Sequence, residues 1–227
     1  QYDSTFTILS IDTAFGSLFV NGYFLDNGET SRFLHRYQPD GTEISEVYGY
    51  RQSPFHKRVV PIGNDHILVV GAIGVGVRRR LADKVSLDGQ VDSSFVQIVP
   101  NTYGVSAAVR DNEGNILVSG DFTVVNGRPS NGFVRIRANG DLDSSSPIVT
   151  QSFQSAGFLV VDPKGGILVS TKDKDHRNMR QTLRRVRSDG SMDEESNYEM
   201  PDGEIIDGLL LATTDTLVVV LTRQTAK

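Results

Sequence analysis

Short apolar runs recur along the 227-residue chain at an almost constant spacing. They begin at residues 18, 67, 116, 167 and 217, which places them 49, 49, 51 and 50 positions apart: Leu18-Phe19-Val20, Ile67-Leu68-Val69, Ile116-Leu117-Val118, Ile167-Leu168-Val169 and Leu217-Val218-Val219. Polar residues and glycines surround these runs, as is typical of short strands buried in a β protein. The spacing predicts an internal repeat of about fifty residues.

Turn dipeptides keep the same period. Their Asp or Asn residues are 48, 51 and 50 positions apart in the series Asp40-Gly41, Asp88-Gly89, Asn139-Gly140 and Asp189-Gly190. The two sets of landmarks predict four full repeats and a partial fifth, within one domain or a fragment of one. The approximate bounds are 1–46, 47–95, 96–146, 147–196 and 197–227.

Each full repeat has room for four strands. In the third repeat, residues 105–109 precede the apolar run and residues 133–136 follow it after a longer polar loop. The Asn-Gly or Asp-Gly dipeptide then leads into a short fourth strand, because both dipeptides permit the positive φ angles of a two-residue hairpin turn. No stretch keeps a 3.6-residue apolar period long enough for a helix. The pattern predicts a four-stranded antiparallel meander.

Sheets of this kind must stack to bury both faces, so the chain is predicted to be all-β. Four-stranded units of about fifty residues fit the blades of a β-propeller, and an open β-solenoid is the alternative. The last repeat lacks its third and fourth strands. We therefore expect five blades if the chain closes alone, and otherwise a ring completed by further sequence or by a partner.

The third repeat resembles the bacterial delta-60 repeat, a β-propeller repeat. The resemblance lies in Gly120-Asp121-Phe122-Thr123, Asn126-Gly127, Phe133-Val134-Arg135-Ile136 and Asn139-Gly140-Asp141-Leu142-Asp143. Val91-Asp92-Ser93-Ser94-Phe95 matches the end of the repeat, whereas the second and fourth repeats depart from its glycine–aromatic loop. The resemblance implies an exported or cell-surface bacterial protein and carries no catalytic residues.

Charged residues also follow the period. A basic residue lies four positions before each turn dipeptide, and an acid lies four positions after three of them: Arg36, Lys84, Arg135 and Arg185, with Asp92, Asp143 and Asp193. Across a two-residue turn these positions point to opposite faces of the sheet. We therefore expect no simple ion pair within the hairpin, and expect instead contacts between blades or Asp side chains bonded to backbone N–H groups.

Composition excludes several classes of function. The net charge of −5 gives no basic field for nucleic acid, and the absence of cysteine removes disulfides, thiolate zinc sites and cysteine nucleophiles. No apolar run approaches the roughly 18 residues of a membrane-spanning helix. The N-terminus, without an initiator Met or a signal-peptide pattern, is typical of a processed chain or a fragment.

Motifs that bear chemistry are weak. The glycine-rich stretch 71–76 lacks the following helix that a phosphate loop needs, and the acidic pairs Asp141/Asp143 and Asp173/Asp175 do not match an EF-hand. The four His residues show no metal-ligand spacing, and there is no GxSxG motif. We therefore expect no cofactor, no metal and no catalytic residues, and an enzyme remains the less favoured class.

The fourth repeat has an uneven charge distribution. Basic residues crowd the stretch 172–187, and acids follow it between 193 and 204. One interpretation is a solvated edge paired with a neighbouring blade, and the other is a contact surface for a protein or an acidic glycan. Nucleic acid is disfavoured, because the basic stretch lacks interleaved aromatic residues.

Loops that interrupt a repeat commonly lie on one face and carry binding. We therefore place the candidate binding residues in the loops after the apolar runs, at 23–32, 72–80, 121–132 and 172–181: Tyr23, Phe24, Arg78, Arg79, Phe122, Arg128, Lys174, Arg177 and Arg180. Arg can fork onto carboxylates, and aromatic rings can stack on sugars or peptides.

The leading hypothesis is a non-enzymatic, exported or cell-surface propeller that binds protein or glycan as an accessory part of a surface assembly. Two alternatives remain open from the sequence. The first is a hydrolase or lyase with its site in the central funnel, and the second is a structural spacer in a repeat array or virion fibre. A fold of this kind hosts both binding and catalysis, so the fold alone does not choose among them.

Overall fold

The computed structural model describes most of the chain and is all-β, with no helix in the described ranges. Those ranges are 6–26, 29–47, 55–73, 80–102, 104–130, 132–143, 156–162, 165–172, 181–187, 191–201, 204–211 and 217–223. In these ranges five antiparallel sheets follow one another in chain order, with one small hairpin beside the third. The all-β prediction is confirmed.

The first and fourth sheets have the predicted four strands in meander order. The first contains β1 (Phe6–Ala14), β2 (Ser17–Asp26), β3 (Glu29–Tyr37) and β4 (Glu43–Glu46), and the fourth contains β13 (Ala156–Val161), β14 (Ile167–Lys172), β15 (Gln181–Val186) and β16 (Met192–Glu199). The apolar runs form the second strand of each sheet. That strand is hydrogen-bonded on both sides, which explains why its residues are the most uniformly apolar.

The other sheets have fewer regular strands. The second sheet contains β5 (Phe55–Ile62), β6 (His66–Ile73) and β7 (Arg80–Ser86), and the third contains β8 (Val105–Arg110), β9 (Ile116–Gly120) and β12 (Phe133–Ile136). In both, a single bridge stands where a fourth strand is expected, Val85 with Val91 and Ile136 with Leu142. The last sheet pairs β17 (Glu204–Leu211) with β18 (Leu217–Arg223), and β10 (Val124–Val125) pairs with β11 (Arg128–Pro129).

The hairpin after each third strand has a three-residue loop, so the expectation of a two-residue turn is wrong. In the second sheet Ser86 N donates to Gln90 O at 2.9 Å, and Gly89 N donates to Ser86 O at 3.0 Å. Gly89 lies in the left-handed region with φ 90°. An Asp-Gly dipeptide suits this turn as well as the two-residue one, because the Gly supplies the positive φ that a G1 bulge needs.

Every sheet also has a β-bulge near the start of its first strand. The pairing register shifts between Ile8 and Ser10, and again at His56/Arg58, Val105/Ala107, Ala156/Leu159 and Ile206/Gly208. These shifts recur at intervals close to fifty residues. A bulge increases the local twist of a strand, so the same twist is built into each sheet at the same place.

Successive sheets pack face to face. We call the face of a sheet that is turned toward the next sheet in the chain its forward face, and the opposite face its rear face. Three buried apolar clusters join the forward face of one sheet to the rear face of the next. In the first of these, Phe19 and Leu34 of the first sheet pack with Ile67 and Val69 of the second. Each of the first four sheets thus buries apolar residues against a neighbouring sheet.

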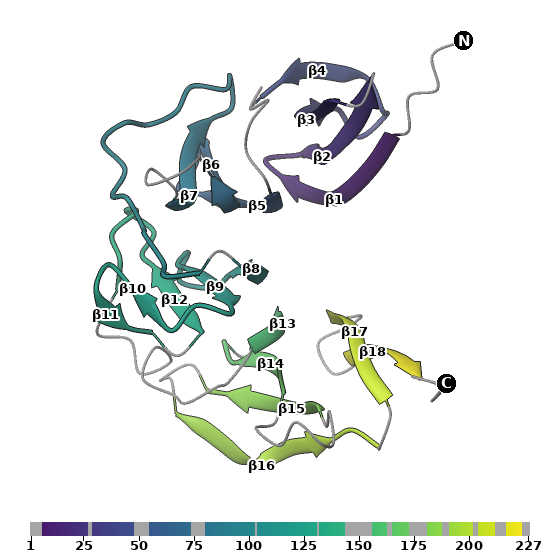
Figure 1. Ribbon diagram of the computed structural model, residues 1–227, viewed down its shortest axis with the longest axis vertical. Helices are drawn as coiled ribbons and strands as arrows, with labels where there is room; N and C mark the ends of the chain where they lie inside the picture. Colours follow the sequence, from purple (N-terminus) through teal and green to yellow (C-terminus); the bar gives the residue numbers. More distant parts are fainter. Residues whose placement is uncertain are drawn as a thin grey trace.

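The sheets form an arc with their first strands inside (Figure 1). Contacts between first strands run in sequence from β1 to β5, β5 to β8, β8 to β13 and β13 to β17. The arc is open between the first sheet and β17–β18 (Figure 1), and within the described residues no strand pairing joins these two sheets. Ring closure is therefore absent from the pairing that the structure describes.

Candidate functional site

The connections between second and third strands share one edge of the arc. All the sheets have the same antiparallel strand order where these strands are described, and their first strands lie side by side around the inside of the arc. Second strands therefore end, and third strands begin, at a common edge. The candidate binding residues that the structure describes belong to this edge.

Tyr23 and Phe24 are half-buried on β2, near its end. Tyr23 lies opposite Arg32 of β3, and the Arg32 guanidinium carbon is 5.6 Å from the centre of the Tyr23 ring. Partial burial lowers the pKa of Arg32 below its ordinary value, and the charge of Tyr23 opposes this shift. The pair is a cation–π contact, so part of the aromatic surface of Tyr23 is already used within the sheet.

The β10–β11 hairpin projects from the connection between β9 and β12. Asn126 and Gly127 form its two-residue turn, with φ 48° and 76°, as a type I′ turn requires. Asn101 holds one strand of the hairpin, since its Oδ1 accepts from Thr123 N and from Val124 N at 3.0 Å each. Asn126 holds the turn, where its Oδ1 accepts from Val99 N at 2.8 Å. The hairpin is thus fixed by hydrogen bonds before any ligand arrives.

Arg128 is exposed on this hairpin and borders a cavity of about 80 Å³. Its apolar lining includes Phe133, Val134 and Leu142, and Asp143 lies at its polar side. Water molecules occupy about 30 Å³ each in the liquid, so the cavity has room for a small apolar group. An exposed guanidinium beside an apolar cavity can bind a carboxylate and an adjacent side chain together.

Phe122 packs in the core and does not present a surface to a partner. Its side chain is 0% exposed and belongs to the cluster between the second and third sheets, with Ile98 and Val125. Its ring also fills the space beside Gly120, where an added Cβ would lie 2.7 Å from it. The aromatic residue in the glycine–aromatic loop therefore anchors the hairpin from beneath.

The remaining candidates lie outside the described residues: Arg78, Arg79, Lys174, Arg177 and Arg180. Of the candidates that the structure places, Tyr23 and Phe24 lie on the first sheet and Arg128 lies on the hairpin beside the third. The second sheet stands between them (Figure 1). The described part of the chain therefore presents two separate places on one edge and does not gather the candidates into one site.

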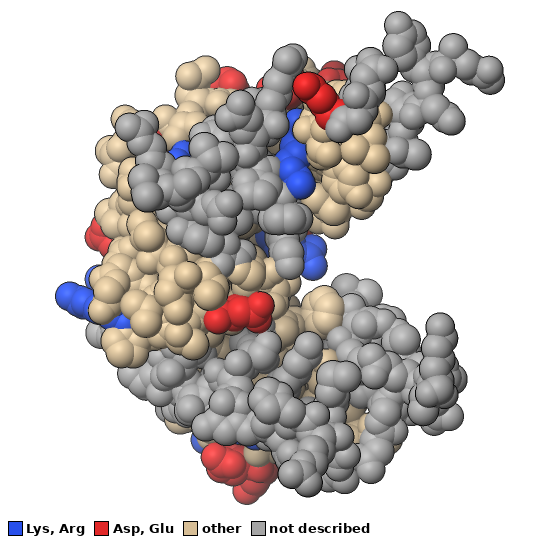
Figure 2. Space-filling view, viewed as in Figure 1, with Lys and Arg blue, Asp and Glu red and all other residues tan. Residues whose placement is uncertain are grey.

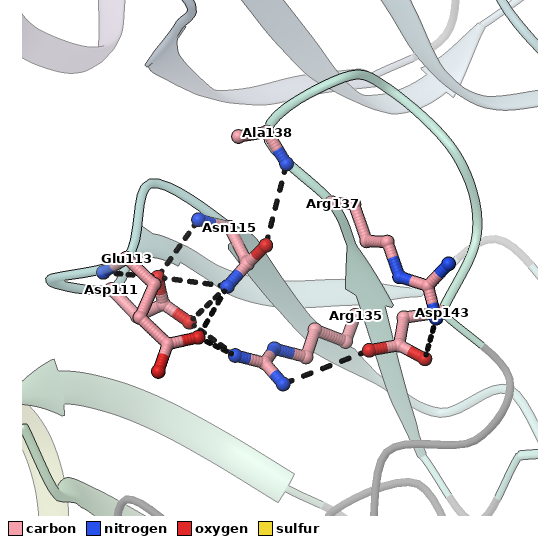
Figure 3. Close-up of polar contacts among 7 residues, drawn as sticks. All are labelled: Asp111, Glu113, Asn115, Arg135, Arg137, Ala138 and Asp143. Atoms are coloured by element: carbon pink, nitrogen blue, oxygen red, sulfur yellow. Dashed lines mark hydrogen bonds and ion pairs between the residues drawn. The ribbon is translucent and has the colours of Figure 1, made fainter.

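Arg135 is the centre of a charged network in the third sheet (Figure 3). Its Nη2 contacts Asp111 Oδ2 at 3.0 Å and Glu113 Oε2 at 2.9 Å, and its Nη1 lies 3.6 Å from Asp143 Oδ2. Arg137 Nη2 approaches the same Asp143 carboxylate at 2.9 Å. The network ties the turn after β8 to β12 and to the segment after its hairpin.

These contacts overturn the expectation that the periodic acids and bases cannot pair within a hairpin. Lys84 Nζ is 2.9 Å from Asp92 Oδ2, and Arg185 Nη1 is 3.0 Å from Asp193 Oδ2. The reason is the three-residue loop, which places Arg185 directly opposite Asp193 on the same face of the sheet. The expected bond from an Asp side chain to backbone N–H is present too, since Ser94 N donates to Asp92 at 2.9 Å.

The fourth sheet repeats the network. Arg185 Nη2 contacts Asp162 Oδ2 at 2.6 Å, and Arg187 Nη2 contacts Asp193 Oδ1 at 2.9 Å. Asp162 and Asp193 raise the pKa of Arg185, and the hydrogen bond from Arg185 is the main cause of the lowered pKa of Asp193. Partly buried ion pairs at equivalent places in two sheets indicate a structural role for these residues.

Sequence reasoning missed Asp111 and Asp162 as partners of the periodic arginines. A signal for them existed, because each opens the turn between the first and second strand of its repeat, 51 positions apart. Asp111 also accepts from Asn115 N at 2.8 Å and so closes its own turn. The Asp111 side chain thus both closes a turn and binds the arginine of the third strand, and the Asp162 side chain binds the arginine of its own sheet.

Other chemistry is sparse in the described part of the chain. No group of three or more His, Asp or Glu residues there could hold a metal ion. No described helix is long and apolar enough to cross a membrane. Among the described residues that Figure 2 colours, basic and acidic side chains lie at several separate places on the visible face.

Comparison with known proteins bears on the third sheet. Residues 113–145 match the family described as "Domain of unknown function (DUF5122) beta-propeller". The match spans β9, the β10–β11 hairpin and β12, together with Arg135 and Asp143 of the charged network. It supports a β-propeller family for this chain. No curated protein matches the chain.

Proposed function

We propose that this protein is a non-enzymatic, exported or cell-surface β-propeller that binds a protein or glycan as an accessory module of a surface assembly. The blades are the five sheets, built from a repeat of the delta-60 kind. The location rests on that resemblance. The binding role rests on the edge formed by the connections between second and third strands.

One observation carries the binding role, namely Arg128 on a fixed hairpin beside an apolar cavity. Asn101 and Asn126 bind the hairpin to the segment before β8, so little conformational freedom is lost when a partner docks. Arg128 would meet a carboxylate of the partner, and the cavity would receive a small apolar group next to it. A protein side chain with a neighbouring acid fits this pair of features, and an acidic sugar fits Arg128 alone.

The test compares Arg128→Ala with Arg110→Ala. Both arginines are exposed on the third repeat, but Arg110 ends β8 at the opposite edge. The chain and both variants are immobilised and challenged with surface extract of the source organism and with an array of acidic and neutral glycans.

We expect a saturable partner that Arg128→Ala loses and Arg110→Ala retains. Binding that both variants retain, or that both lose equally, would place the interaction elsewhere. No binding from either source would remove the proposal.

A further inference from the structure

The cavity beside Arg128 has room for one small side chain. Its volume is about 80 Å³. An apolar cavity of about 150 Å³ in another protein binds benzene. The cavity beside Arg128 has about half that volume and is therefore too small for an aromatic ring. A side chain of the size of Val or Ala fits it.

The wall of the cavity is mostly apolar. Its apolar residues are Val125, Pro129, Phe133, Val134 and Leu142. Ser130 also lines the cavity, but its Oγ donates to Phe133 O at 2.9 Å, so the hydroxyl proton is directed at the backbone. Pro129 has no backbone N–H to offer. A charged group or a peptide group that entered the cavity would lose its hydrogen bonds to water without replacing them on this wall.

Asp143 supplies a hydrogen-bond acceptor at the polar side of the cavity. Its carboxylate lies 2.9 Å from Arg137 Nη2 and 3.6 Å from Arg135 Nη1. An ionised carboxylate has about four acceptor positions, so Asp143 can accept a further N–H next to these two arginines. Because the arginines already offset its charge, a neutral amide N–H suits this carboxylate better than a third cation does.

The C-terminal residue of a protein carries on one Cα the three groups that this place can receive. These groups are a carboxylate for the exposed guanidinium of Arg128, a side chain for the cavity and an amide N–H for Asp143. We infer that the site captures the free C-terminus of a partner protein that ends in a small apolar residue such as Val or Ala. The inference rests on the binding role proposed above for Arg128 and its cavity.

Other carboxylates fit this place less well. An internal acidic residue beside an apolar one needs two ordered residues to fill the same features, and the peptide group that follows the apolar residue would lie against the apolar wall without a partner. An acidic sugar meets Arg128 but leaves the apolar cavity without an apolar group. A chain terminus avoids both costs, because no further peptide group follows its last side chain.

The test measures the binding of fluorescein-labelled peptides to the 227-residue chain by fluorescence anisotropy. The first peptide is Gly-Ser-Gly-Ser-Val with a free C-terminal carboxylate. Its controls are the same peptide with a C-terminal amide and two free acids that end in Phe or Lys. We expect the Val acid to bind at least about tenfold more tightly than each control, because a charge-assisted hydrogen bond or the fit to the cavity is lost in each.

Three variants assign the preference to the site. We expect Arg128→Ala to abolish the preference for the acid over the amide and Arg110→Ala to keep it. Leu142→Ala enlarges the cavity and should shift the preference from a terminal Val toward a terminal Leu.

Equal binding of the acid and the amide, an acid preference that Arg128→Ala retains, or no binding of any peptide overturns the inference. Free valine that competes as strongly as the peptide overturns it too, because the ligand would then be an amino acid. The proposed function fails separately. It stands if the surface extract holds a partner that only Arg128→Ala loses, even when no peptide binds, and it falls if neither the extract nor the glycan array holds such a partner.

Discussion

Replacing Arg135 by Met is the substitution whose cost follows most directly from the charged network. The guanidinium side chain is 19% exposed, and its partners Asp111 and Asp143 are 10% and 9% exposed. Removing one member of a buried ion pair typically costs about 3 to 5 kcal/mol, because the other charge stays buried without its partner. In the variant, Asp111 keeps its hydrogen bond from Asn115, and Asp143 keeps its ion pair with Arg137. We therefore expect a loss near the lower end, about 3 kcal/mol, in the free energy of unfolding measured with urea.

Arg137→Met is the matched control. Arg137 contacts the same Asp143 carboxylate at 2.9 Å, but its side chain is 50% exposed. Exposed pairs contribute about 0 to 1 kcal/mol, so this variant should unfold at nearly the urea concentration of the wild type. Equal losses of unfolding free energy for Arg135→Met and Arg137→Met would refute the reasoning, because the burial of an ion pair would then not determine how much it stabilises the fold.

Three further predictions follow from the same structure. Phe122→Ala removes a fully buried ring and should cost about 3 to 5 kcal/mol by urea unfolding, whereas a loss below 1 kcal/mol would show that the ring is not packed. The free energy of unfolding should fall as the pH drops from about 5, because Asp193 has a lowered pKa in the folded state and its stabilising charge is lost on protonation. The variant Asp193→Asn should flatten this pH dependence, and an unchanged slope would contradict the prediction. Gly120→Ala should lower the melting temperature, because its Cβ would crowd Phe122 and the Gly104 carbonyl, and an unchanged value would show that the backbone is looser there.

Periodicity in the sequence was enough to place the second strand of each sheet and the third strand of the third repeat. The apolar runs form the second strands, and the third strand of the third repeat lies at 133–136 as expected. The signal is strong because a central strand must be apolar on both faces when sheets stack on either side. The prediction of an all-β chain depends on this signal, on the turn dipeptides and on the absence of a helical apolar period.

The ion pairs could not be predicted, because they depend on the length of one loop. An Asp-Gly dipeptide serves both the two-residue turn and the three-residue turn with a bulge. One extra residue changes which side chains share a face. The sequence therefore predicts opposite faces for Lys84 and Asp92, although the two side chains form a contact of 2.9 Å.

The candidate site was predicted only in part for a similar reason. The sequence located the loop that holds Arg128, but it could not show that Phe122 folds inward beneath the hairpin. An aromatic residue next to Gly and Asp in a loop is equally compatible with an exposed stacking surface and with a core anchor. The structure distinguishes them because Ile98, from the preceding segment, reaches the same cluster.

The forward face of each of the first three sheets packs against the rear face of the next sheet. NOEs between methyl and aromatic protons of neighbouring sheets measure this packing directly. The account predicts cross-peaks between Phe19 and Val69 and between Leu117 and Val169, which belong to the clusters joining the first sheet to the second and the third to the fourth. A folded protein in which both cross-peaks are absent, while those within each sheet are present, would contradict it.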